Sequence, residues 1–166
     1  MNMLANLARW VRVRGLREGP MQIGRVEGLP NDARDDAQRP QDYGFAAMPV
    51  DGQGLKLEMG GHAIIIRMDR LAERPHLAEY EVCVWHKEGH RLTLKAGGVV
   101  QVDCAELVVS ASGRVAINTP AVSISGNLEV GGTTTSVGDV LGAGVSLQSH
   151  THGGVRAGAD STAPPN

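Results

Sequence analysis

Two histidines near the end of the sequence, His150 and His152, are separated by a single residue. In an extended segment their imidazoles point to the same side. Two imidazoles from one chain make a poor metal site, and such a pair more often lies in a solvated loop. Three copies of the chain on one axis would instead supply six nitrogen donors. Six donors favour octahedral Fe(II), Co(II) or Ni(II) over four-coordinate Zn(II), and a filled coordination sphere makes the site structural.

The chain that leads to these histidines is also unusual, because no Phe, Tyr or Trp occurs from His86 to Asn166. Aromatic side chains supply much of the buried area of an ordinary core, so this half of the chain must stabilise its fold in another way. We therefore predict a boundary between residues 86 and 90. The five aromatic residues all precede it, at Trp10, Tyr43, Phe45, Tyr80 and Trp85.

An apolar repeat runs through residues 90–148. Its units are pairs of apolar residues two positions apart, which lie on one face of a strand. The pairs are Leu92/Leu94, Val100/Val102, Leu107/Val109, Val115/Ile117, Val122/Ile124 and Leu128/Val130. Turn-forming residues stand between the pairs, at 96–98, 112–113, 118–120, 125–127 and 131–132.

The length of the repeat favours an intertwined trimer. Each strand buries only a thin stripe, and a monomeric β-solenoid usually needs about 18 or more residues per coil. Units of six to eight residues suit three chains that wind together with their apolar stripes on a shared axis. A monomeric solenoid is the alternative. Between Val115 and Val155 the only charged residues are Glu129 and Asp139, which suits a smooth, weakly charged rod that is pushed through something.

The first half of the chain predicts a short helix followed by a small barrel or sandwich. Leu4, Leu7, Ala8 and Val11 follow helical spacing over residues 2–14, with the nearby arginines on a solvated face. Short alternating strands are expected next, with a polar loop over 31–42. The predicted strands cover residues 22–26, 46–50, 54–59, 62–68 and 79–85.

Other residues with chemical potential have weaker patterns. The formal net charge of −2 argues against a dedicated nucleic-acid binder. We find no nucleophile, acid–base pair or phosphate-binding loop, and therefore predict no enzyme. The remaining histidines, His62, His76, His86 and His90, show no metal-ligand spacing in the sequence.

Several motifs together resemble one family, the central tail spike or baseplate assembly protein V of contractile-tailed bacteriophages, especially its Mu-like branch. Residues 43–52 and 60–61 resemble the N-terminal domain of that family, and residues 74–92 its passage into the shaft. The most specific match is the segment Ser-His-Thr-His-Gly-Gly at 149–154.

The resemblance implies an all-β protein: an N-terminal OB-like barrel, then a trimeric intertwined β-helix with a pointed, metal-bound apex. The expected division of the chain is a hub-attachment helix at 1–15, a barrel at 16–88, a shaft at 89–148 and an apex at 149–166. It further implies one iron ion per homotrimer, held by His150 and His152 of each chain. Calcium and chloride ions are also implied, with ligands unassigned.

The same resemblance implies a structural spike in the virion tail baseplate that pierces the host outer membrane. The spike would be assembled in the host cytoplasm, with a baseplate hub protein and a separate tip protein as partners and no nucleic acid. A trimeric fibre tip that recognises a surface glycan is the alternative, although the distal half lacks the aromatic residues common in sugar sites. A metalloenzyme would need an open metal position and a nearby base, for which Asp160 is the only carboxylate in the tail.

Overall fold

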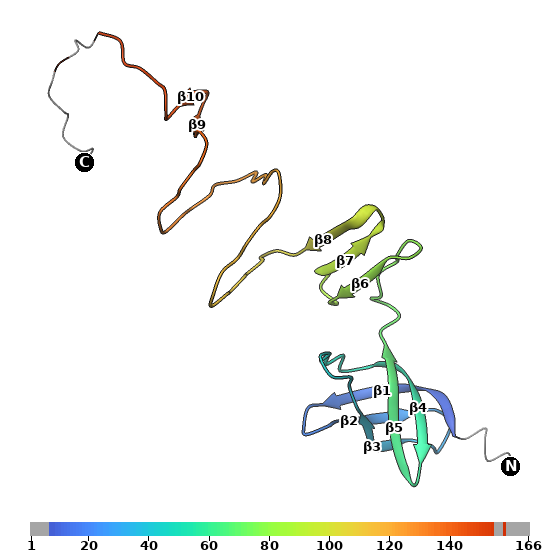
Figure 1. Ribbon diagram of the computed structural model, residues 1–166. Helices are drawn as coiled ribbons and strands as arrows, with labels where there is room; N and C mark the ends of the chain where they lie inside the picture. The colour runs from blue at the N-terminus through green and yellow to red at the C-terminus, as the bar shows by residue number, and fades with distance from the viewer. Residues whose placement is uncertain (1–6, 155–157, 159–166) are drawn as a thin grey trace. The chain divides into compact units, whose positions relative to one another are not determined.

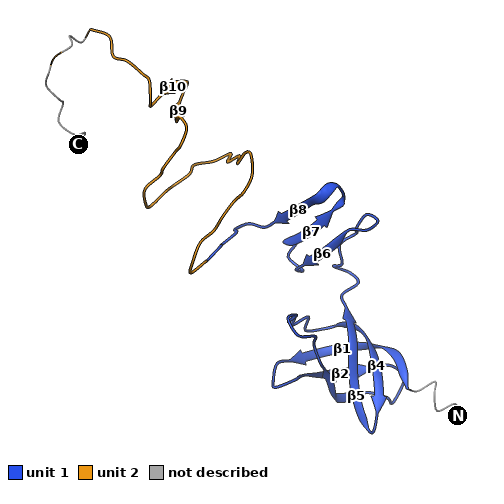
Figure 2. Cartoon of the chain, in the orientation of Figure 1, with its two compact units in different colours: residues 1–110 blue, residues 111–166 orange. Residues whose placement is uncertain are grey.

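The computed structural model describes residues 7–154 and residue 158. It divides into two compact units, residues 1–110 and 111–166 (Figure 2). Among the described residues, the only helical element is a single 3-10 turn, Ala96–Gly98. The predicted all-β class is therefore confirmed. No helix in this part of the chain is long and apolar enough to cross a membrane.

Five strands form a closed barrel at the start of the first unit (Figure 1). They are β1 (Ala8–Arg17), β2 (Gln22–Glu27), β3 (Arg34–Arg39), β4 (Gly52–Met59) and β5 (His62–Asp69). Their order around the barrel is β1-β2-β3-β5-β4, with β4 returning to β1. All the pairs are antiparallel except β3 with β5. This closed five-stranded barrel confirms the OB-like fold that was predicted.

The predicted N-terminal helix is wrong where the structure describes it, because residues 8–17 form β1. Residues 1–6 of that prediction lie outside the described residues. Val11 and Val13 are buried while Arg12 and Arg14 are exposed, which is the two-residue period of a strand. The apolar residues at helical spacing concealed this alternation. The arginines lie on a strand and not on a helix, and Arg14 pairs with Glu27 on β2.

The region between β2 and β4 also differs from the prediction. The segment 31–42, expected to be a polar loop, contains β3, whereas 46–50, expected to be a strand, has no regular structure. Four of the six residues of β3 are charged, and only Ala37 is fully buried. Its strand conformation depends on pairing with β2 and β5, which a local pattern does not reveal.

The barrel core is small and aliphatic. It consists of Val11, Val13, Leu16, Val26, Ala37, Ala63 and Ile65. The aromatic residues are absent from it: Trp10 is 71% exposed, Phe45 74% and Tyr80 98%. The aromatic content of the first half therefore did not predict where its core lies.

One charged side chain is fully buried in the barrel. Lys56 on β4 has no exposed surface. Its Nζ lies 2.8 Å from Glu58 Oε1 and 3.2 Å from Asp32 Oδ2. Asp32 in turn lies 3.0 Å from the guanidinium of Arg9. Burial of an ammonium group is tolerated because these carboxylates compensate for its lost hydration.

A separate three-stranded antiparallel sheet follows the barrel in the chain. It contains β6 (Val82–Trp85), β7 (Arg91–Lys95) and β8 (Val99–Asp103), in that order. The closed barrel spans residues 8–69, so β6 pairs within this sheet and not with the barrel strands. Six apolar residues of the sheet lie on one face and are exposed in the single chain. They are Val82, Val84, Leu92, Leu94, Val100 and Val102.

The second unit is extended and has little pairing within one chain. Its described strands are β9 (Leu141–Gly142) and β10 (Val145–Ser146), which form a two-stranded hairpin. Upstream of this hairpin, extended stretches are separated by sharp bends (Figure 1). The bends fall at 112–113, 120, 125–126, 131–132 and 137–138, and the first four of these confirm predicted turns. The β-helix itself is not seen in the single chain and stays a prediction.

Candidate metal centre at the apex

The hairpin of β9 and β10 organises the backbone just before the predicted metal ligands. Ala143 and Gly144 form its two-residue turn, with φ angles of 50° and 85°. Two successive residues at positive φ are typical of a type I′ turn, whose twist matches the flanking strands. Beyond the hairpin, the N–H of Leu147 donates to the carbonyl of Val140 at 3.0 Å.

Asp139 lies just before the hairpin and links its two ends. Its Oδ1 accepts hydrogen bonds from the N–H groups of Val140, at 2.8 Å, and Gln148, at 3.1 Å. A hydrogen bond from Ser146 and those from the backbone hold the pKa of the Asp139 carboxyl below its ordinary value. The ionised carboxylate therefore fixes the segment that leads into His150.

Ser146 connects the hairpin to the first histidine. Its carbonyl oxygen lies 2.8 Å from Nδ1 of His150. Because a carbonyl only accepts, Nδ1 must carry the proton, and the lone pair of the neutral ring is then on Nε2. A backbone carbonyl on one ring nitrogen is the usual way in which a metal-binding imidazole is oriented. His150 is therefore prepared to bind a metal through Nε2.

The second predicted ligand lies beside the first. The ring centroids of His150 and His152 are 5.1 Å apart, with the rings at 78° to each other. Both residues are exposed. The turn at 153–154 follows directly, and Gly154 has a φ of 77°, a left-handed conformation that glycine adopts freely. The rest of the predicted apex, 155–157 and 159–166, lies outside the described residues.

The donor set fits a transition metal, but one chain supplies only part of a coordination sphere. Two neutral imidazoles suit Zn, Cu, Fe or Ni, and a stable centre needs at least four ligands. The remaining donors must come from outside this pair. This incompleteness agrees with a site that is assembled from several copies of the chain.

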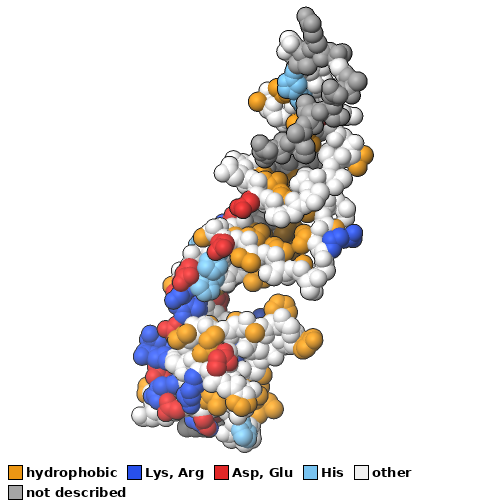
Figure 3. Space-filling view, turned by 90° about the vertical axis from the view of Figure 1, so that its left-hand side faces the viewer, with side chains coloured by type: hydrophobic (Ala, Val, Ile, Leu, Met, Phe, Trp, Pro, Cys, Tyr) orange, Lys and Arg blue, Asp and Glu red, His pale blue; other side chains and the backbone are white. Residues whose placement is uncertain are grey.

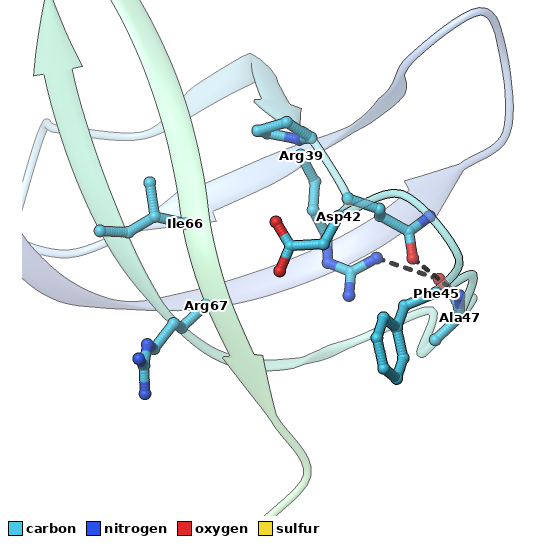
Figure 4. Close-up of a pocket in the computed structure, with 8 residues that line it drawn as sticks. Arg39, Asp42, Phe45, Ala47, Ile66 and Arg67 are labelled. Carbon is cyan, nitrogen blue, oxygen red and sulfur yellow. Dashed lines mark hydrogen bonds between the residues drawn. The ribbon is translucent and has the colours of Figure 1, made fainter.

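Two further places on the molecule bring polar side chains together. A cavity on the barrel is lined by Arg39, Asp42, Phe45, Ile66 and Arg67, among others (Figure 4). The guanidinium of Arg39 donates to the carbonyl of Ala47 at 3.0 Å, so it holds the loop that forms the cavity rim.

The other place is the turn between β6 and β7, where the structure brings His86, Glu88 and His90 together. Sequence spacing missed this cluster because its members meet across a hairpin and not along a helix. The signal that would have found it is the Glu-Gly turn between two alternating strands.

Two regions of the chain are similar to known protein families. Residues 14–69 match the family model of the N-terminal domain of bacteriophage Mu Gp45. Residues 144–166 match the model of the GpV Apex motif, which includes both His150 and His152. Residues 14–69 and 144–166 are thus similar to the N-terminal domain and the apex of Mu-like baseplate spike proteins, and the resemblance predicted from the sequence is confirmed.

Two relatives agree with this class. The Mu-like prophage FluMu protein gp45 of Haemophilus influenzae is 25% identical over 131 residues, which are 73% of this chain and 71% of that protein. The baseplate puncturing device gp45 of Escherichia phage Mu is 26% identical over 116 residues. These residues are 66% of this chain but only 57% of the Mu protein, so less than two thirds of its length is matched. The relatives support a structural role and a location in the virion tail baseplate, as predicted.

Proposed function

We propose that this chain is the membrane-piercing spike of a contractile tail, a homotrimer whose distal half is an intertwined β-helix closed by one iron ion. In this arrangement residues 89–148 form the shaft and residues 149–166 the apex. The barrel attaches the spike to a baseplate hub protein, and the host outer membrane is the target.

The observation that carries the proposal is the exposed apolar stripe of the distal half. In one chain Leu107 is 67% exposed, Ile117 68% and Leu128 70%, and the described part of residues 111–140 has no strand pairing. Groups of exposed hydrophobic side chains are visible on the surface in the space-filling view (Figure 3). A soluble protein rarely leaves such a continuous surface in water. Three chains that share one axis would bury it.

The surface chemistry of the distal unit supports a piercing role. Among its described residues, Arg114, Glu129 and Asp139 are the only charged side chains. Charged groups are costly to bring into the hydrocarbon of a membrane. A shaft whose outer surface is mostly Ser, Thr, Asn and Gly passes a lipid barrier with fewer such groups to desolvate.

The apex would then act as a structural clamp. His150 and His152 of three chains supply six imidazole donors, and such a set is complete without water or substrate. An iron ion bound there holds three strand ends together at the point that meets the membrane first. The relative from phage Mu is named a baseplate puncturing device, and a filled coordination sphere agrees with a structural role. A separate tip protein on this apex, and bound calcium and chloride ions, remain predictions of the resemblance.

The piercing function is tested with assembled tails. Tails that carry this chain are contracted on host cells, and release of a periplasmic enzyme is measured. We expect release with the native chain and severalfold less with His150→Ala/His152→Ala, because the apex then frays. Equal release from the two kinds of tail would contradict a piercing role for the metal-bound apex.

A further inference from the structure

The turn between β6 and β7 holds a cluster of metal-binding side chains that is separate in sequence from the apex. The last register pair before this turn is Trp85 with Arg91. The turn is closed by two backbone hydrogen bonds, from His86 N–H to the His90 carbonyl at 3.0 Å and from Gly89 N–H to the His86 carbonyl at 2.9 Å. Gly89 has a φ of 96°, which allows the chain to return to β7. The backbone therefore fixes His86 opposite His90.

The side chains converge as well. The imidazole rings of His86 and His90 are stacked, with centroids 4.6 Å apart and planes within 10° of parallel. Nδ1 of His86 lies 3.3 Å from the backbone N–H of Glu88 and 3.7 Å from its carboxylate. Because an N–H only donates, the lone pair of His86 is on Nδ1 and faces Glu88. One ligand atom from each of the three residues lies within 4.8 Å of the others.

We propose that His86, Glu88 and His90 bind a divalent transition cation of the zinc class. Two imidazoles and one carboxylate are a frequent ligand set for zinc, and the fourth position is then free for water or another ligand. Ligand atoms on a tetrahedral zinc ion lie about 3.4 Å apart, since each metal–ligand bond is about 2.1 Å long. An imidazole lone pair lies in the plane of its ring, so the stacked rings of His86 and His90 must rotate before both nitrogens face one ion, and the exposure of all three side chains allows this rotation.

The local charge limits the affinity of the site. Glu88 supplies the one negative charge among the ligands, and Lys87 lies in the same turn and repels a cation. The guanidinium of Arg91, next to His90, is paired with Asp103 at 3.0 Å and is partly neutralised. We therefore expect micromolar binding and not the tight binding of a buried structural zinc site. A bound ion would fix the hairpin at the start of the shaft.

The test uses the full chain with His150→Ala/His152→Ala as the parent, so that the apex ligands contribute nothing. Zinc alone is added, and the metal-to-chain ratio is measured by equilibrium dialysis and elemental analysis. We expect one zinc per chain. His86→Ala or His90→Ala should weaken binding by about tenfold or more, and Glu88→Gln should weaken it in the same direction. The matched control is His62→Ala, which removes an exposed histidine of the barrel and should change nothing.

A second readout reports directly on the turn. In the Trp10→Phe variant of the same parent, Trp85 is the only tryptophan, and it directly precedes His86. Paramagnetic Co(II) in the site should quench its fluorescence, and His90→Ala should remove that quenching. No zinc binding by the parent, or equal binding by the parent and by the His86 and His90 variants, would overturn the proposal. Neither result depends on iron at the apex.

Discussion

At the scale of single residues, the barrel depends on one buried charge. Lys56 is fully buried, pairs with Ile65 in the register of β4 with β5, and is compensated by Glu58 and Asp32. Once the ammonium group is removed, both carboxylates lose a partner, although Asp32 keeps Arg9 and both remain partly exposed. The cost is therefore lower than for a pair that is wholly buried.

We expect Lys56→Ala to lower the free energy of unfolding of the barrel by about 2–3 kcal/mol. Chemical denaturation followed by circular dichroism measures this change. The control is Lys95→Ala, whose exposed side chain donates a hydrogen bond to Gln101. It should change stability by less than about 0.5 kcal/mol. Equal effects of the two substitutions would show that Lys56 is not compensated as described.

Asp139 predicts a pH dependence of the apex. Its pKa is lowered in the folded chain by hydrogen bonds to the carboxylate, from Ser146 first and then from the backbone. The stability that it contributes is therefore fully present above the ordinary value of 3.8 and is lost as the pH falls through the lower folded value. The hairpin before His150 should loosen only in that acidic range.

The amide proton of Gln148 reports this titration by NMR, because it donates to Asp139. Its chemical shift should change as the pH falls below 3.8 in the native chain and should not titrate in Asp139→Asn, which is neutral at every pH. Glu129→Gln, the other acidic position among the described residues of the second unit, is the control and should keep the native titration. A titration that survives in Asp139→Asn would contradict the assignment.

At the scale of elements, the sheet of β6 to β8 presents one apolar face that needs a partner. Leu94 lies near the centre of that face, opposite Val82 on one side and Val100 on the other. In the proposed trimer this face lies against the other two chains. A carboxylate there would be buried without a counter-ion, once in each chain.

We therefore expect Leu94→Asp to shift the protein from trimer to monomer, as measured by light scattering. Lys95→Asp places the same charge at the neighbouring position, whose side chain points to the other face of the sheet. It should leave the trimer intact. A trimer that tolerates Leu94→Asp would show that this face is not an interface.

Some of the strands could be predicted from the sequence and others could not. β2, β4 and β5 were predictable because apolar residues alternate between clear turn residues such as Gly60 and Gly61. The apolar positions at the start of β1 satisfy both periods, so the sequence there predicts a helix. β3 was missed because its strand conformation comes from neighbours distant in sequence.

The candidate sites also include features that the sequence predicts and features that it does not. His150 and His152 could be predicted as a pair because residues two positions apart point to the same side of an extended chain. The hydrogen bond from His150 to Ser146 could not be predicted, because it depends on the turn between them. His86 and His90 meet only through the register of β6 with β7, which no spacing rule encodes.

At the scale of the whole molecule, the proposed threefold assembly accounts for both the apolar repeat and the histidine pair. The single chain leaves the apolar stripe of the repeat exposed and supplies only two imidazoles, His150 and His152, for a metal. Burial of the repeat and binding of the metal should nevertheless contribute separately to the stability of the assembly. The repeat from Leu92 to Val130 should hold the trimer without the metal.

We accordingly expect His150→Ala/His152→Ala to lose iron and to loosen the apex but to remain a trimer. Elemental analysis and light scattering on the same sample measure both properties. Thr151→Ala, between the two histidines, is the matched control and should keep the metal. A monomeric double variant would mean that the metal, and not the repeat, holds the shaft together.

The most direct test of the spike is the mass of the native full-length protein, measured together with its iron content after purification without chelator. We expect three chains per particle and one iron ion per three chains. A monomer mass, or less than about a tenth of an iron ion per trimer, would contradict the metal-closed trimer.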